Sequence, residues 1–167
     1  MPIVPINDLP DSSRAWVFGS DRTLDSAKSE QLLNEVDRFL AGWKAHGAPL
    51  RSGRDWKYGR FLTVAVDPTT VGASGCSIDG LFRALKSFET QLGASLVTSG
   101  LVFYRDANGE VQSVDRDRFA SLSADGRITP ATSVFDPTVT TLGEWKARFE
   151  LIAKNSWHAG LLQNQPA

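Results

Sequence analysis

At the centre of the chain, residues 56–66 read Trp56-Lys57-Tyr58-Gly59-Arg60-Phe61-Leu62-Thr63-Val64-Ala65-Val66. Side chains two positions apart lie on the same face of a β-strand. One parity of this run carries Trp56, Tyr58, Arg60, Leu62, Val64 and Val66, and the other carries Phe61, Thr63 and Ala65. Because the second half of the run is apolar on both parities, we expect a central strand that is buried on both faces and ends at Asp67-Pro68.

Amphipathic helices are predicted before and after this strand. The first has an apolar residue at every third or fourth position, which is the spacing of one helix face: Leu32, Leu33, Val36, Phe39, Leu40 and Trp43. Asp25 or Ser26 can cap its start, and the sequence His46-Gly47-Ala48-Pro49 is expected to end it, which gives a helix over 26–46. A second stripe predicts a helix over 77–92 that ends near Gly93: Ile78, Leu81, Phe82, Leu85, Phe88 and Leu92.

Shorter elements are expected around this framework, and together they indicate an α+β fold class. We predict strands over 14–20, 96–104 and 133–135, while 145–152 fits either a helix or a strand. The sequence Asp106-Ala107-Asn108-Gly109 predicts a hairpin turn, and Asp115 can cap a short helix that Gly126 terminates.

We expect one compact α+β domain over residues 1–167. It would contain a mixed or antiparallel sheet, the two main helices at about 26–46 and 77–92, and a C-terminal region with a hairpin and a short helix. The alternative division gives subdomains 1–93 and 94–167.

Composition restricts the partners and the compartment. The 18 basic and 19 acidic residues nearly cancel, so the chain has no bulk attraction to nucleic acid, which is not expected as a partner. No apolar run reaches the roughly 18 to 20 residues of a membrane-spanning helix, and residues 1–6 lack the pattern of a signal peptide. A single cysteine and two histidines predict a cytoplasmic protein without an internal disulfide or a metal site. No cofactor is expected.

A segment with possible chemistry is Gly72-Ala73-Ser74-Gly75-Cys76-Ser77-Ile78-Asp79-Gly80, which joins the central strand to the second helix. The free N–H groups of a helix N-terminus attract anions, so Ser74, Gly75 and Ser77 are candidate ligand-binding residues. The basic and aromatic run 51–60 adds Arg60 and Trp56 as further candidates if it lies beside this segment. Neither a phosphate-binding loop nor a dinucleotide fingerprint is present.

Cys76 is a candidate nucleophile or redox sensor in the same segment. Its position in the first helical turn favours the thiolate, His46 or His158 would supply a base, and the charge of Asp79 opposes ionisation. In the structural alternative, Ser74 or Ser77 caps the helix and Cys76 is buried. His46 then belongs to a helix end, and His158 lies on the surface near the tail.

Four segments resemble a family of small uncharacterised bacterial proteins: Arg14-Ala15-Trp16-Val17-Phe18, Trp43-Lys44-Ala45-His46-Gly47, Gly75-Cys76-Ser77-Ile78-Asp79 and Ser156-Trp157. Members often carry the label ABC transporter ATPase, whereas this chain has no Walker A motif, so the resemblance implies a bacterial origin and no established activity. Residues 103–136 are also similar to GYF-type protein-interaction domains, although the glycine-tyrosine-phenylalanine element is absent.

The function expected from these observations is that of a non-catalytic protein-binding or accessory subunit of a larger bacterial assembly. Missing catalytic signatures, abundant aromatic residues and the partial likeness to an interaction domain favour it. One alternative is a thiol enzyme or redox sensor centred on Cys76. Another is a binder of small anions or nucleotides that uses the 72–80 loop.

Overall fold

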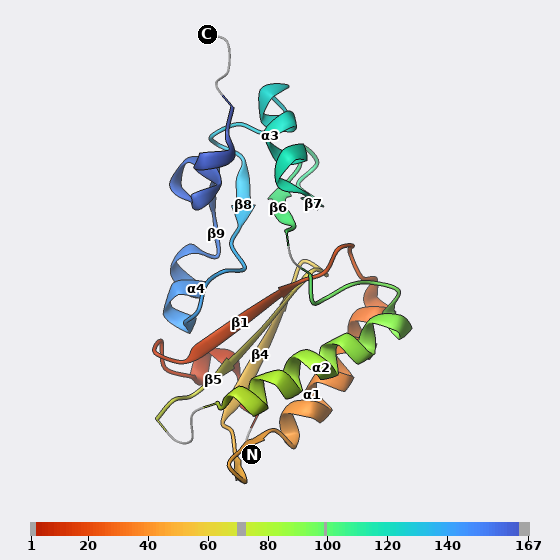
Figure 1. Ribbon diagram of the computed structural model, residues 1–167, viewed down its shortest axis with the longest axis vertical. Helices are drawn as coiled ribbons and strands as arrows, with labels where there is room; N and C mark the ends of the chain where they lie inside the picture. Colours follow the sequence, from red (N-terminus) through yellow and green to blue (C-terminus); the bar gives the residue numbers. More distant parts are fainter. Residues whose placement is uncertain (1–2, 70–72, 99, 164–167) are drawn as a thin grey trace. The chain divides into compact units, whose positions relative to one another are not determined.

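A computed structural model describes residues 3–69, 73–98 and 100–163 of the chain (Figure 1). The predicted α+β fold class is confirmed, because helices and antiparallel sheets both form from the described residues. The chain divides into two compact units. We call residues 1–98 with 138–147 the first unit, and residues 99–137 with 148–167 the second unit.

The first unit is built on a three-stranded antiparallel sheet in the order β1 (Arg14–Gly19), β5 (Phe61–Val66), β4 (Ser52–Lys57). All six residues of β5 are buried, so the predicted central strand is confirmed. It does not begin at Trp56, however. A tight turn at Tyr58 and Gly59 ends β4 and reverses the chain into β5, because both residues have positive φ, at 61° and 67°.

Two helices, α1 (Ser26–Ala41) and α2 (Gly75–Leu92), cover one face of this sheet (Figure 1). Arg54 of β4 forms a two-pronged ion pair with Asp37 of α1, and the ring of Phe18 in β1 packs edge-on against Phe82 of α2. Interdigitated aliphatic side chains fill the space between the layers: Leu32, Val36, Leu40, Leu62, Val64, Leu81 and Leu85.

Helix α1 starts as predicted and ends earlier than predicted. The Asp25 carboxylate accepts the amide of Lys28 at 2.8 Å, which confirms the N-cap. The last helical residue is Ala41, and the chain then forms a small hairpin of β2 (Lys44–Ala45) and β3 (Ala48–Pro49). His46 and Gly47, with φ of 52° and 79°, form the turn of this hairpin instead of the predicted helix end.

The other face of the sheet is covered by the N-terminal segment and by α4 (Leu142–Arg148). The amide of Val4 donates to the carbonyl of Ser52 at 2.8 Å, and the Lys57 ammonium lies 4.8 Å from the centroid of the Trp145 ring. Between these contacts runs the short 3-10 helix η1 (Ile6–Asp8), whose Ile6 lies close to Gly53.

The second unit contains a four-stranded antiparallel sheet in the order β7 (Val111–Val114), β6 (Val102–Arg105), β8 (Ser133–Phe135), β9 (Glu150–Ile152). Its other elements are α3 (Arg116–Ala124) and the 3-10 helices η2 (Ala153–Asn155) and η3 (Trp157–Leu161). The core joins sheet and helices through Val102, Phe119, Leu122, Ile128, Val134 and Ala153. The predicted turn at Asp106 and cap at Asp115 are confirmed, whereas the strand predicted over 96–104 is limited to β6.

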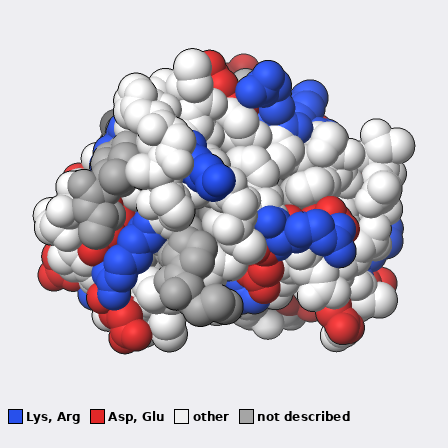
Figure 2. Space-filling model, turned by 90° about the horizontal axis from the view of Figure 1, so that it is seen from below, with Lys and Arg blue, Asp and Glu red and all other residues white. Residues whose placement is uncertain are grey.

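Charged side chains of both signs share the surface. On the face in Figure 2, lysines and arginines alternate with acidic residues and uncharged stretches, and no continuous basic patch forms there. Among the helices of the described residues, none combines the length and the apolar character that crossing a bilayer requires.

Two glycines of the first unit predict opposite responses to alanine. A methyl group at Gly80, inside α2, would lie 3.8 Å from the Phe39 ring, so Gly80→Ala should raise the free energy of unfolding by about 0.5 to 1 kcal/mol. A methyl group at Gly53 would lie 2.7 Å from the Val4 carbonyl oxygen, so Gly53→Ala should lower it by roughly 1 kcal/mol or more. Urea unfolding measures both, and equal effects of the two changes would contradict the packing described for β4.

Candidate functional site

The N-terminus of α2 is closed by its own side chains. The Ser77 amide donates to the Ser74 hydroxyl at 3.1 Å, and the Ser74 amide donates to the Ser77 hydroxyl at 2.7 Å, a reciprocal capping box. The indole N–H of Trp43 donates to the Ser77 carbonyl at 2.8 Å. Both candidate serines are therefore used in capping, and the exposed Gly75 offers only its backbone.

The other candidates at this end of α2 are exposed. Cys76 is an exposed free thiol, so the alternative in which it is a small buried residue is wrong on that point. Asp79 is exposed one turn into the helix. His46 is exposed in the hairpin turn that follows Trp43, and β2 of this hairpin packs against α2. His158, the other histidine considered as a base, belongs to the second unit.

Arg60 does not lie beside the N-terminus of α2. The Arg60 side chain donates to the carbonyl of Ser20. The next residue, Asp21, accepts a hydrogen bond from the amide of Ser95, which lies just beyond the C-terminus of α2. An 18-residue helix is about 27 Å long, so the start of α2 lies well away from Arg60. Gly72 lies outside the described residues. Trp56, the remaining candidate, is half-buried against the core of the first unit.

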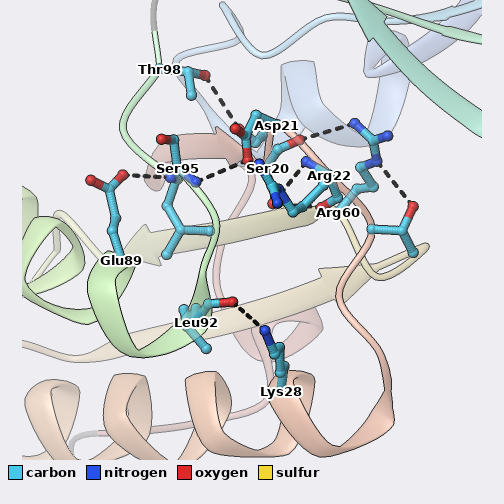
Figure 3. A network of polar contacts seen from close by, with 12 residues as sticks. Ser20, Asp21, Arg22, Lys28, Arg60, Glu89, Leu92, Ser95 and Thr98 are labelled. Atoms are coloured by element: carbon cyan, nitrogen blue, oxygen red, sulfur yellow. Dashed lines mark hydrogen bonds and ion pairs between the residues drawn. The ribbon is translucent and has the colours of Figure 1, made fainter.

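Arg60 is instead a buried structural cation at the start of β5 (Figure 3). Its side chain is 5% exposed and donates to the Ser20 carbonyl at 3.1 Å and to the Thr23 hydroxyl at 3.2 Å. Its own carbonyl accepts the Ser20 amide at 2.7 Å. Burial lowers the pKa of Arg60, and the nearby charge of Asp21 opposes this effect. Arg60 thus fastens the loop between β1 and α1 to the turn that precedes β5.

The same network holds the end of α2 (Figure 3). The Asp21 carboxylate accepts the Ser95 amide at 2.9 Å, and Glu89 accepts the amides of Leu96 and Val97 at 2.6 and 3.0 Å. Lys28 donates to the carbonyl of Leu92, the last residue of α2, at 2.8 Å. The loop between β1 and α1 therefore connects the turn at Arg60 with the segment beyond the end of α2.

The turn between β4 and β5 rests on this network. Its backbone closes with a 3.0 Å bond from the Arg60 amide to the Lys57 carbonyl, and the Gly59 carbonyl accepts the Leu24 amide at 2.9 Å. A Cβ at Gly59 would lie 2.9 Å from the Leu24 carbonyl oxygen, so only glycine fits. Tyr58, the other central residue, has a φ of 61° and is 45% exposed.

Sequence reasoning missed Tyr58 as a functional candidate. The alternation of side chains continues through residues 56–66, which concealed the turn. The signal that was present is Gly59, because glycine is common in short hairpin loops, and this loop consists of the three residues between the paired Lys57 and Phe61.

The second unit has its own exposed aromatic side chain, Trp157, which is 37% exposed. Its indole stacks on the imidazole of His158 at a centroid distance of 3.9 Å, and the guanidinium of Arg116 lies over the indole at 5.1 Å. The Nδ1 atom of His158 lies 2.8 Å from the Ser156 hydroxyl. His158 is fully buried, so its predicted surface position is wrong: Trp157 and Phe119 enclose the ring.

Burial lowers the pKa of His158 from 6.5 to about 4. The carboxylate of Asp136 favours the imidazolium and opposes this effect, while Arg116 adds to the lowering. The Nε2 atom is buried and has no hydrogen-bond partner among the described atoms. The ring is therefore neutral at pH 7 and anchors the structure around it. A base whose pKa lies this far below 7 and whose Nε2 atom is buried is poorly suited to proton transfer at neutral pH.

Two aspartates of the first unit, Asp67 and Asp55, are buried and half-buried, respectively. Asp67 accepts bonds from the Thr69 hydroxyl and amide at 2.6 and 2.8 Å and from Arg51 at 2.8 Å, and these bonds lower its pKa. Burial raises the pKa of Asp55, and the positive charges of Lys57 and Arg54 partly offset this rise. No group of three or more metal-ligating side chains comes together among the described residues.

Comparison with protein-family models, with curated proteins and with solved structures found no match to this chain.

His158 predicts a pH dependence of stability. Its folded pKa lies below the ordinary value, so the unfolded chain takes up the proton first as the pH falls. The contribution of His158 is therefore constant above about pH 7, and between pH 6.5 and 4 it lowers the free energy of unfolding by up to about 3 kcal/mol.

Urea unfolding of the parent chain and of His158→Phe between pH 4 and 7 isolates this term, since the ring-for-ring change removes only one titrating group. His46→Asn is the control, because His46 is exposed. Equal pH profiles for the parent chain and His158→Phe would contradict the assignment.

Proposed function

We propose that the chain is a non-catalytic, protein-binding subunit of a larger assembly in the bacterial cytoplasm, and that it contacts its partner through Tyr58. The observation that carries the proposal is a bulky side chain in a left-handed backbone conformation that nevertheless remains 45% exposed. Backbone strain that persists at an exposed position is a reason to look for a role in binding.

The strain at Tyr58 has a definite size. A left-handed conformation costs a non-glycine residue roughly 1 to 2 kcal/mol, and asparagine or glycine relieves much of it. His46 occupies the same place in the other hairpin, but histidine is one of the residue types that tolerate this conformation. Tyrosine does not belong to that group, so the left-handed conformation costs more at Tyr58 than at His46.

The support beneath Tyr58 suits recognition. The Gly59 carbonyl is bonded to Leu24 and the Arg60 side chain to Ser20 and Thr23, so the backbone of the turn has little freedom to move. A tyrosine on a rigid base buries a large area at a small cost in side-chain entropy, which is why such residues dominate many protein interfaces.

Tyr58→Asn tests the proposal. The change should raise the free energy of unfolding by about 1 kcal/mol, because strain is released, and should weaken partner binding by about 30-fold, the effect of losing a contact worth about 2 kcal/mol. Crosslinked pull-down of the tagged chain from a bacterial host identifies the partner, and titration of the purified pair then measures affinity.

His46→Asn is the matched control, since it also introduces asparagine at a positive-φ residue that precedes a glycine in a hairpin loop, and Cys76→Ser controls for thiol chemistry. Both should bind like the parent chain. Unchanged affinity of Tyr58→Asn would overturn the proposed contact, and loss of binding in Cys76→Ser alone would favour a function centred on the thiol. A lower stability of Tyr58→Asn would mean that packing explains the tyrosine.

A further inference from the structure

A second candidate binding feature lies in the second unit, where Arg116, Trp157 and His158 form what we call the Arg116 stack. The guanidinium of Arg116 lies 5.1 Å from the centre of the Trp157 ring, and the same indole stacks on His158 at 3.9 Å with 22° between the planes. Arg116 is exposed and Trp157 is 37% exposed, whereas His158 is fully buried.

The buried histidine gives the stack a rigid base. Ser156 bonds to its Nδ1 atom at 2.8 Å, and the Phe119 ring of α3 lies 5.8 Å from the imidazole. Because a neutral imidazole in this position cannot move without breaking core contacts, the indole above it is held in one orientation.

No local pairing accounts for the position of Arg116. It is the first residue of α3, where the helix dipole disfavours a cation. Its side chain has no hydrogen bond or ion pair with any other residue that the structure describes. The neighbouring Asp115 carboxylate instead caps the helix by accepting the Arg118 amide at 2.7 Å. The cation–π contact with Trp157 is the contact that holds the guanidinium.

A contact with the face of an indole leaves most of the five N–H donors of a guanidinium available, and no hydrogen bond to a described residue uses those of Arg116. Those donors match the two oxygens of a carboxylate, and a guanidinium fixed in advance loses little entropy when it binds one. We propose that the Arg116 stack is a receptor for a carboxylate group on an acidic peptide segment of a protein partner.

A carboxylate suits this position better than a phosphate. Asp115 and Asp117 lie on either side of Arg116 in the chain, and both repel a bound anion. A phosphate monoester carries a charge of about −1.5 to −2 at pH 7, so this repulsion acts on it more strongly than on a singly charged carboxylate. The proposal does not depend on Tyr58, which belongs to the first unit.

NMR titration of the full chain with a hexaglutamate peptide tests the receptor. We expect shifts of the Arg116 Nε–H and Trp157 indole N–H signals, and a loss of affinity of at least about 10-fold in Arg116→Gln. Trp157→Ala should weaken binding as well, because the guanidinium loses its support.

Arg118→Gln is the matched control, an exposed arginine two residues further along the same helix, and its affinity should stay within about twofold of the parent chain. The spectrum of each variant shows that it is folded. If Arg116→Gln and Arg118→Gln lost the same affinity for the peptide, general charge attraction would explain the binding, and the proposal would be overturned. The absence of shifts at Arg116 and Trp157, or the same shifts produced by inorganic phosphate at lower concentration, would also overturn it.

Discussion

The first unit depends on enclosing one charged group, the guanidinium of Arg60, at the end of its central strand. A buried cation is costly unless its donors are satisfied, and here the Ser20 carbonyl and the Thr23 hydroxyl accept from it. These partners come from the loop between β1 and α1, so satisfying the arginine also determines the path of that loop. Burial of Arg60 and the position of the loop are therefore a single constraint.

Several other features follow from this constraint. The loop that Arg60 fixes carries Asp21, which holds Ser95 beyond the end of α2, and Leu24, which holds Gly59 in the hairpin turn. Close contact between Gly59 and Leu24 restricts the backbone of the turn to one path. On this path the residue before Gly59 has a left-handed conformation. That residue is Tyr58, and the proposed binding role follows from its exposure.

Much of the fold could be predicted from the sequence, because apolar periodicity reports directly on burial. The spacing of Leu81, Leu85 and Leu92 predicted α2 to within two residues, and the run Phe61–Val66 predicted the central strand. Periodicity failed where a turn preserves the alternation of side chains, as at Tyr58 and Gly59. Periodicity also placed the end of α1 too late, because Trp43 continues the apolar stripe of the helix although the helix ends at Ala41.

The site residues were harder to predict, because their roles depend on contacts distant in sequence. Arg60 was a candidate only if it lay beside the start of α2, and the structure links it through Ser20 and Asp21 to the segment beyond the other end of that helix. His158 was assigned to the surface from its place near the tail, but Phe119 and Trp157 enclose it. Only local features, such as the serine cap of α2, were visible from neighbouring residues alone.

The central claim is that the Arg60 network holds Tyr58 rigidly in its left-handed conformation before any partner binds. Backbone ¹⁵N relaxation of the free protein measures this most directly at the amides of Tyr58 and Gly59. We predict order parameters of about 0.85 at both residues, equal to those of β5. Values below about 0.6 would show a turn that moves freely, and would contradict it.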